Sequence, residues 1–550
     1  MDSQRLQEFF DSVALIIGEP NVSRHSSSGG LEGPSGSTAY GDPFASPMSH
    51  EPSGAVRPKS VDEVREIVRL ANQYVIPLWT VSRGKNLGYG GSAPVVKGTV
   101  VLDLHRMNTI VEINEEYGYA IVEPGVSFFD LYEEIQRRGL KLWPSVPAIG
   151  WGSVLGNTTE RGFGYTPLGD HAQAQCGMEV VLPNGELLRT GMGAMEGSQL
   201  FALYKGPIWV QFSYLKSIYH SSLGSRIDSD IILVPLLGIV TKIGIQMIPA
   251  PEAYATVEVD VPQESDLVAL VSILSDLMRR SVILNSPSIA NIFRIALTSR
   301  VASVQGKVQG YMKPHSYVPY DVLEEIRVEQ KWGFWRAYFS LYSQVELLPG
   351  LLQTTRRAFN AIPGATMKWR EFPGTPGESI TTATIKEEEI PHSGIPTLAP
   401  LAILNSRQKP GSHIDYSPLF PPSGRELYEW YLKAKQRTVD AKFDFFADFH
   451  VFPRHVIGIE LIIYTDEEAE SVDQLMRHVI HDAAEMGYTA YRTHLDYMDE
   501  VASHFNFNGG ALKQFTTKLK EFLDPRGILS PGKSGIWPSG RSSVNSKPRM

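Results

Sequence analysis

One glycine-rich loop near the start of the chain constrains its fold more than any other feature. The loop spans residues 81–94 and reads VSRGKNLGYGGSAP, between apolar runs at 76–81 and 99–104 that are typical of buried strands. Glycines let the backbone approach a ligand closely, and successive free N–H groups form an anion-binding concavity. Because Arg83 and Lys85 add positive charge, the loop predicts a diphosphate-binding site.

The spacing of these glycines differs from the two common phosphate loops. It is neither a G-x-G-x-x-G run that opens a helix nor a P-loop, so a Rossmann cofactor site is not indicated. From this loop alone, a plain turn between two strands is an equally good interpretation. A second glycine-rich loop, GWGSVLGN at 150–157, and a hairpin signal at 183–185 favour a ligand site over structural glycines.

Length and composition narrow the class of protein. A chain of 550 residues is too long for one compact core and predicts two domains. A net charge of −9 argues against nucleic acid as a general partner, and the single Cys176 excludes an intrachain disulfide. No apolar run reaches membrane-spanning length, and no signal peptide or S-K-L ending is present. We therefore expect an intracellular protein, cytoplasmic or peroxisomal, with no membrane partner.

Local patterns predict an α+β fold rather than a doubly wound sheet, because short strands and helices alternate without a regular βαβ repeat. Residues 1–58 are expected to hold one amphipathic helix and a Ser/Gly/Pro-rich segment from residue 23 that is a surface connection or disordered. A capping box at Ser60 and Glu63 predicts the next helix. We expect a first domain at 59–250 that contains both glycine-rich loops, an antiparallel sheet covered by helices at 251–490, and a return to the first domain at 491–550.

Several motifs together resemble one enzyme family. The run R-G-x-N-x-G-Y-G-G followed by A-P resembles the pyrophosphate loop of the vanillyl-alcohol oxidase and 4-cresol dehydrogenase family of FAD enzymes. The second loop and the run LDPRGILSPGKSGIWP at 523–538 are also similar to that family. The resemblance covers 56–538 but breaks at 206–237, which is either a divergent segment or a gene-model error. It implies a two-domain FAD-binding fold with an antiparallel-sheet cap domain.

The resemblance also implies the cofactor site. The residues that it assigns to FAD are Arg83, Gly84, Lys85, Asn86, Leu87, Gly88, Gly152, Ser153, Gly156, Asn157, Gly164, Val240, His413 and Lys533. The run GSHIDYSP at 411–418 is similar to the family's G-x-H-x-x-x-S-P run, whose histidine is bonded to the flavin. It implies covalent FAD through His413, although the cresol dehydrogenases use a tyrosine and Tyr416 is close by. A lone histidine in a loop is otherwise a structural or solvated residue. No metal site is expected.

Two tyrosines and an arginine could bind a phenolate. An arginine stays charged and lowers the pKa of a bound phenol, and tyrosine hydroxyls donate hydrogen bonds to the same oxygen. Taken alone, each tyrosine is more often a packing residue. The resemblance assigns this role to Tyr89, Tyr491 and Arg492.

The implied reaction is oxidation of para-substituted phenols. A hydride leaves the benzylic carbon, a para-quinone methide forms, and O2 is reduced to hydrogen peroxide. The expected partners are thus a small phenolic substrate and O2, in a homodimer or a higher homo-oligomer by analogy. The alternatives are a cytochrome-linked 4-alkylphenol dehydrogenase, although no C-x-x-C-H haem motif is present, and a flavoprotein with impaired or no catalysis.

Three residues depart from the family pattern or are ambiguous. Ala148 stands where vanillyl-alcohol oxidase carries an acidic residue, so flavin incorporation or activity on some substrates is expected to suffer. Trp151 replaces a glycine of the second loop and is expected to narrow the site. His455 either lines the substrate cavity or lies on the surface of the cap domain.

Overall fold

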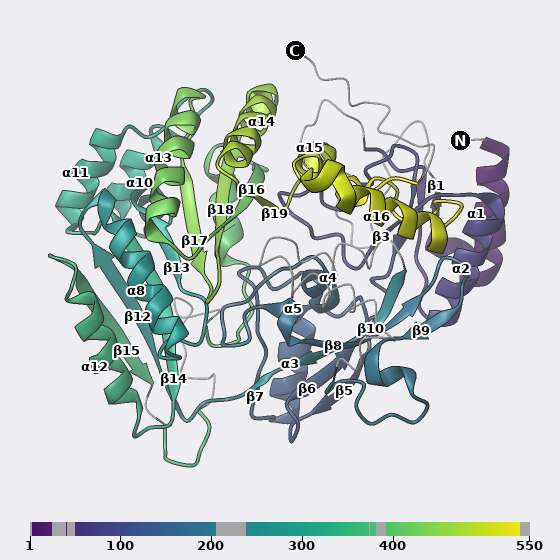
Figure 1. Cartoon of the computed structure of the whole chain (residues 1–550), viewed down its shortest axis with the longest axis horizontal. Helices are drawn as coiled ribbons and strands as arrows, with labels where there is room; N and C mark the ends of the chain where they lie inside the picture. The colour runs from purple at the N-terminus through teal and green to yellow at the C-terminus, as the bar shows by residue number, and fades with distance from the viewer. Residues whose placement is uncertain are drawn as a thin grey trace.

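The computed structural model describes residues 3–24, 40, 50–204, 238–372, 374–380 and 392–538. Two groups of sheets lie side by side, one built mainly from the N-terminal third and the other from the middle of the chain (Figure 1). This arrangement confirms the predicted α+β class. The divergent run at 206–237 lies outside the described residues. None of the described helices is long and apolar enough to cross a bilayer.

The first sheet carries the glycine-rich loop at one end. Its order is β1 (Val22–Arg24), β2 (Gly54–Val56), β4 (Val100–Asp103) and β3 (Leu78–Val81), and β4 is parallel to both β2 and β3. Helices α1 (Ser3–Ile17) and α2 (Val61–Tyr74) bury apolar side chains against it. The loop leaves β3 at residue 81, so the sheet fixes where the loop starts.

Two of these strands correct the expectation at the two ends of the segment 23–58, of which 25–39 and 41–49 lie outside the described residues. β1 begins at Val22, and Ala55 and Val56 of β2 are fully buried in the core. Three-residue strands are too short to show a period in the sequence, which is why they were not predicted. The Ser60 cap of α2 is present, but the Glu63 carboxylate accepts from the N–H of Lys59 rather than from that of Ser60.

A second, antiparallel sheet holds the other glycine-rich loop. Its order is β5 (Ile110–Asn114), β6 (Tyr119–Val122), β10 (Ile239–Gln246), β8 (Gln175–Val181) and β9 (Leu187–Arg189). The predicted hairpin joins β8 to β9. Helices α3 (Phe128–Arg138), α4 (Val154–Thr159) and α5 (His171–Ala174) accompany the sheet, and β7 (Leu142–Trp143) pairs with β11 (Ile248–Pro249) beside it.

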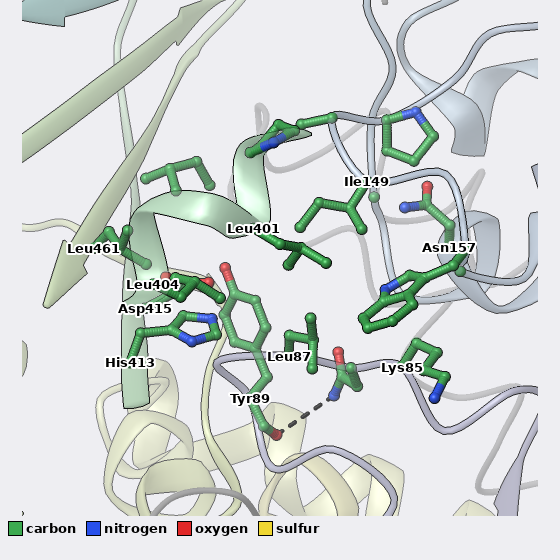
Figure 2. Close-up of a pocket in the computed structure, with 18 of the residues that line it drawn as sticks. Lys85, Leu87, Tyr89, Ile149, Asn157, Leu401, Leu404, His413, Asp415 and Leu461 are labelled. Carbon is green, nitrogen blue, oxygen red and sulfur yellow. Dashed lines mark hydrogen bonds between the residues drawn. The ribbon is translucent and has the colours of Figure 1, made fainter. Parts of the chain in front are cut away.

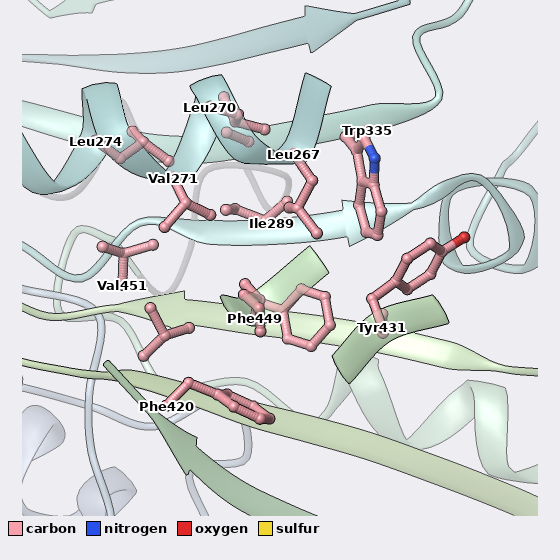
Figure 3. Close-up of a cluster of buried hydrophobic side chains, with 14 of the residues drawn as sticks. Leu267, Leu270, Val271, Leu274, Ile289, Trp335, Phe420, Tyr431, Phe449 and Val451 are labelled. Atoms are coloured by element: carbon pink, nitrogen blue, oxygen red, sulfur yellow. The ribbon is translucent and has the colours of Figure 1, made fainter. Parts of the chain in front are cut away.

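The third sheet is the expected antiparallel cap. Its eight strands run in the order β15 (Thr366–Phe372), β12 (Ala253–Val261), β14 (Trp335–Ser343), β13 (Ser288–Asn291), β17 (Phe446–Val451), β18 (Val456–Tyr464), β16 (Ser412–Phe420) and β19 (Thr489–Arg492). One face packs against α8 (Leu267–Arg279), α12 (Leu348–Phe359), α13 (Gly424–Asp440) and α14 (Ala469–Glu485). Figure 3 shows Leu267, Leu270 and Leu274 of α8 above Ile289 and Phe449 of the sheet.

The opposite face of this sheet points toward the first two sheets. Side chains alternate between the faces of a strand, so Ala447 and Phe449 join the main core while Phe446, Asp448 and His450 face the other way. Helices α9 (Ile292–Leu297), α10 (Ala302–Gln309) and α11 (Tyr320–Gln330) cover part of that second face. The uncovered part is where a ligand can lie.

The C-terminal segment connects the two groups of sheets. β19 pairs with β16 at the edge of the large sheet, and the chain then passes through α15 (Met498–Ser503) and α16 (Phe507–Leu523). Leu495 and Met498 pack on Trp79 and Ala93, and Leu529 forms a parallel bridge with Leu78 of β3. The end of the chain thereby holds β19 beside the glycine-rich loop. The domain boundaries themselves stay predictions.

Candidate functional site

A cavity of about 1580 Å³ lies between the two glycine-rich loops and the open face of the large sheet. Loop residues between 79 and 93 and between 147 and 163 form one side. Strands β16, β17 and β18 and helices α9 and α10 supply the other. Figure 2 shows His413, Asp415 and Leu461 on the side opposite Lys85 and Asn157. Residues from both ends of the chain therefore meet in one space.

The cavity gathers the residues predicted to hold the cofactor, with two exceptions. Arg83, Gly84, Lys85, Asn86, Leu87, Gly152, Ser153, Gly156, Asn157, Val240, His413 and Lys533 all line it, whereas Gly88 and Gly164 do not. A Cβ on Gly164 would lie 2.2 Å from Ser145 Oγ and 2.6 Å from His171 Nε2, so this glycine is required for packing. A Cβ on Gly88, whose φ is +77°, would lie 2.5 Å from Asp415 Oδ2.

The two cations of the first loop have different partners. Arg83 donates from Nε to the carbonyl of Trp151 (3.0 Å) and from Nη1 to that of Gly125 (2.8 Å), so it joins the two loops. The Lys85 ammonium lies 4.8 Å from the centre of the Trp151 ring. Burial and the nearby charge of Arg83 lower the pKa of Lys85, and an anion at the loop would restore it.

The second loop ends in a short helix that faces the cavity. Ser153 caps α4, accepting from the N–H of Gly156 (3.0 Å) and donating to the carbonyl of Pro124 (2.5 Å). Asn157 is held by His171, whose Nδ1 lies 2.6 Å from Asn157 Oδ1. Burial lowers the pKa of His171 to about 4, so its ring is neutral at neutral pH. The positions of these polar groups are therefore fixed by the fold.

Lys533 reaches the same cavity from the C-terminal run. Its ammonium forms an ion pair with Glu160 (2.8 Å) and lies 5.4 Å from the ring centre of Trp79. The side chain of Lys533 is buried, so the pair holds the C-terminal segment against the second loop.

The three residues predicted to bind a phenol come together. The guanidinium carbon of Arg492 lies 3.9 Å from the ring centre of Tyr89 and 5.9 Å from that of Tyr491, and all three residues line the cavity. The Tyr89 hydroxyl is 2.6 Å from Ser417 Oγ. Burial raises the pKa of both tyrosines, which keeps their hydroxyls protonated as hydrogen-bond donors.

Arg492 is a half-buried cation whose Nε is buried. Burial opposes its charge, but Tyr491 and Tyr89 more than offset this and hold the pKa of Arg492 above its ordinary value. Its Nε has no hydrogen-bond partner within the part of the chain that the structure describes. A buried charged donor without a partner is costly, so this position is suited to an anionic oxygen of a ligand.

His413 lies on a strand, which corrects the expectation that it occupies a loop. It is the second residue of β16 and points into the cavity next to Asp415 (Figure 2). Gly411 and Pro418 resemble turn residues in the sequence and concealed the strand. Burial lowers the pKa of His413 to about 4, which leaves the imidazole neutral. Tyr416 faces the other side of the sheet, where its ring centre is 6.0 Å from that of Trp430.

Sequence reasoning missed two acidic residues in the cavity. Asp415 and Asp448 both line it, and Asp448 Oδ1 lies 2.6 Å from Arg294 Nη1 and 3.1 Å from His450 Nε2. Burial raises the pKa of Asp448, but Arg294 and His450 outweigh burial and hold it below its usual value. The signal that could have found Asp448 and His450 is their alternation with apolar residues in the run FADFHV at 446–451, which is typical of a strand.

The departures from the family pattern also lie at this site. Ala148 and Trp151 both line the cavity, and the indole N–H of Trp151 is buried without a partner in the described structure. His455 is not among the lining residues; its ring stacks on Phe452 with centres 4.8 Å apart. No group of three or more His, Cys, Asp or Glu within the described residues could hold a metal ion.

These features fit an FAD molecule. Gly156 lies so close to the first loop that a Cβ would fall 2.3 Å from Ser82 Oγ, while Gly152 faces open space. The two loop cations and a cavity of about 1580 Å³ lined by both glycine-rich loops match a dinucleotide cofactor with a diphosphate. The residues present therefore fit the cofactor that the sequence predicted.

Comparisons with known proteins support an FAD-binding fold. Residues 52–191 match the model of a FAD binding domain, and residues 421–534 match that of the C-terminal domain of FAD linked oxidases. The chain is 32% identical to the 4-cresol dehydrogenase [hydroxylating] flavoprotein subunit of Pseudomonas putida, over 89% of this chain and 88% of that protein.

Two solved structures share the fold. One is the 4-ethylphenol oxidase of Gulosibacter chungangensis in complex with isoeugenol, at 30% identity, a TM-score of 0.84 and 98% coverage of both chains. The other is p-cresol methylhydroxylase with substrate bound, at 28% identity, a TM-score of 0.83 and 98% coverage of both chains. The chain therefore belongs to the vanillyl-alcohol oxidase and 4-cresol dehydrogenase family of FAD-dependent oxidoreductases.

Proposed function

We propose that the protein is an oxidase of para-substituted phenols, such as 4-alkylphenols or vanillyl alcohol. The observation that carries this proposal is the guanidinium of Arg492, whose Nε is buried without a partner in the described structure and whose carbon lies near the rings of Tyr89 and Tyr491. Two neutral donors and one cation match a single phenolate oxygen. The names of the relatives, a 4-cresol dehydrogenase and a 4-ethylphenol oxidase, support a phenol as the ligand.

Catalysis begins with ionisation of the phenol. Arg492 lowers the pKa of the bound hydroxyl, and Tyr89 and Tyr491 donate hydrogen bonds to its oxygen. The phenolate pushes electron density through the ring and weakens the para benzylic C–H bond. Bound FAD supplies a two-electron acceptor for the hydride that leaves this carbon. The substrate becomes a para-quinone methide, and the three residues stabilise charge on its oxygen throughout.

Asp448 is the group that we propose acts on the quinone methide. Ionised and lining the cavity, it can take a proton from water that adds to the benzylic carbon, and the product is then the alcohol. Loss of a proton from the next carbon instead gives the alkene. Asp448 would thereby compensate for the missing acid at Ala148.

We further propose that His413 carries the covalent bond to FAD. Its neutral imidazole points into the cavity, whereas Tyr416 is packed against Trp430 in the apolar core. A homo-oligomer and an intracellular, cytoplasmic or peroxisomal, location stay predictions.

Oxygen uptake tests the choice of electron acceptor. The flavin-loaded protein is mixed with 4-ethylphenol or vanillyl alcohol in an oxygen electrode, and peroxide is measured at the end. An oxidase consumes oxygen and forms peroxide in equal amounts with the oxidised product. Slow oxygen uptake combined with fast reduction of added cytochrome c would favour the dehydrogenase alternative, and no product with any acceptor would favour a flavoprotein without catalysis.

A further inference from the structure

The carboxyl group of Asp415 is the feature of the cavity that the proposed reaction leaves without a role. Strand β16 sends His413, Asp415 and Ser417 to one face, because side chains two residues apart share a face. Ser417 contacts the Tyr89 hydroxyl and His413 points into the cavity, so Asp415 lies between the two. Figure 2 shows it beside the ring of Tyr89.

Asp415 is held firmly in this position. Its backbone N–H donates to the carbonyl of Gly88 (3.4 Å), and a Cβ on Gly88 would fall 2.5 Å from Asp415 Oδ2 and 2.8 Å from Cγ. The residue is 8% exposed. The first glycine-rich loop therefore restricts the rotamers of Asp415, and its carboxyl group is a fixed part of the cavity wall.

One oxygen of this carboxyl group has no partner. Oδ1 is buried and accepts no hydrogen bond within the described residues. Burial raises the pKa of Asp415 to about 7, while Arg492 and Tyr89 act in the opposite direction. Buried acceptors are nearly always satisfied, so the missing donor is expected to come with the ligand.

The position of Asp415 indicates which ligand atom this donor is. The phenol oxygen is assigned to Tyr89, Tyr491 and Arg492, and Asp415 neighbours Tyr89 and Arg492. A group that reaches Oδ1 must then stand on the ring carbon next to the phenol carbon. A hydroxyl there donates a hydrogen bond, a hydrogen atom offers nothing, and a methoxy group turns only lone pairs toward the carboxyl oxygen.

We propose that Asp415 selects substrates with a hydroxyl group next to the phenol oxygen, so that the preferred class is the para-substituted catechols. This inference rests on the proposed function, because it uses the phenol-binding role of Tyr89, Tyr491 and Arg492. The second hydroxyl stays neutral and donates to Asp415, while the first is ionised beside Arg492. Asp415 is thus a specificity-determining residue of the same site.

Ligand binding to the flavin-loaded protein tests the proposal without turnover. The probes are 4-nitrocatechol, 4-nitrophenol and 2-methoxy-4-nitrophenol, which have no benzylic hydrogen, and their dissociation constants are read from the change in visible absorbance. The wild type is expected to bind 4-nitrocatechol about tenfold more tightly than the other two, as befits a hydrogen bond to a charged acceptor. The readout is the dissociation constant of each of the other two probes divided by that of 4-nitrocatechol. This ratio cancels effects that the three probes share.

Two variants and one control complete the design. Asp415→Ala removes the acceptor and should bring the ratio to within about twofold of unity, and Asp415→Asn, which keeps the shape, should retain part of it. Ser417→Ala also perturbs Tyr89 and should leave the ratio unchanged. A wild-type ratio near unity, or one that survives in Asp415→Ala, would overturn the inference and leave the proposed function intact. If none of the three probes binds, the phenol site itself is wrong.

Discussion

The guanidinium carbon of Arg492 lies 3.9 Å from the ring centre of Tyr89. The two residues come from opposite ends of the chain: Tyr89 from the loop after β3 and Arg492 from β19 at the edge of the large sheet. The contact joins the two groups of sheets and places a cation beside two tyrosines in the cavity wall. The predictions below follow from this arrangement and from the residues around it.

Replacing Arg492 with alanine is expected to lower kcat/KM for para-substituted phenols by about 100- to 1000-fold. The loss reflects one charged donor removed from the oxygen on which charge develops in the transition state. Steady-state assays on the flavin-loaded fraction measure it. Arg477 is the matched control, because its guanidinium lies 5.2 Å from the Tyr497 ring but outside the cavity. Equal losses in Arg477→Ala and Arg492→Ala would contradict the assigned role.

Replacing His413 with alanine is expected to convert a covalent flavoprotein into one with dissociable FAD. Acid precipitation is the assay: flavin stays in the pellet of the wild type and moves to the supernatant of His413→Ala. Tyr416→Phe is the control and should keep its flavin in the pellet, because Tyr416 packs against Trp430 away from the cavity. Retention of flavin by His413→Ala would remove the proposed linkage.

Replacing Asp448 with asparagine is expected to change the products of 4-ethylphenol more than the rate of its oxidation. Asparagine cannot take the proton from water, so less alcohol and more 4-vinylphenol should form. The amide keeps the volume of the side chain, but the ion pair with Arg294 is lost. Product ratios by chromatography give the answer, and an unchanged ratio of alcohol to alkene would show that another group activates the water.

Stability is expected to depend on pH through Glu460, a buried residue outside the cavity. Burial raises the pKa of Glu460 from its ordinary value of 4.5 to about 8. The hydrogen bond that Trp430 donates to the carboxyl group (2.5 Å) lowers this pKa but does not outweigh burial. The folded state therefore binds more protons than the unfolded state between these pH values. The contribution of Glu460 to stability falls as pH rises through this window, with a slope of up to about 1.4 kcal/mol per pH unit.

Glu460→Gln tests this prediction, because glutamine is neutral at every pH and keeps the shape of the side chain. The free energy of unfolding of the variant, relative to the wild type, should increase from pH 5 to pH 8. Chemical denaturation at several pH values measures the difference. If the difference between the two proteins is independent of pH, Glu460 does not titrate in this range.

The motifs of the two glycine-rich loops predicted much of the cavity lining, because glycines let the backbone approach a ligand closely. Gly164 shows the limit of this reasoning, since it fills a packing position against Ser145 rather than the cavity wall. β1 and β2 were not predicted because strands of three residues carry no period. In the cap, β12 is long enough to show alternation, as in its run TVEVDV, so the antiparallel sheet could be predicted.

Asp415 and Asp448 could not be assigned from the sequence because their roles depend on distant segments. Asp415 lies close to Gly88 of the first glycine-rich loop. Asp448 forms an ion pair with Arg294, which lies on another element of the cap. Alternation with apolar residues indicates which face of its strand Asp448 occupies, but no local pattern indicates which distant residues lie against that face. By contrast, Arg492 lies beside Tyr491 in a recognisable motif, so the sequence could assign it before any contact was known.

Anaerobic mixing of the flavin-loaded protein with 4-ethylphenol tests the central claim most directly, because it separates oxidation of the phenol from the choice of acceptor. The account predicts that the visible flavin absorbance bleaches rapidly in the wild type and far more slowly in Arg492→Ala, while dithionite bleaches both. Absorbance that persists in the wild type with 4-ethylphenol, vanillyl alcohol and 4-methylcatechol alike, in protein that dithionite does bleach, would contradict the account.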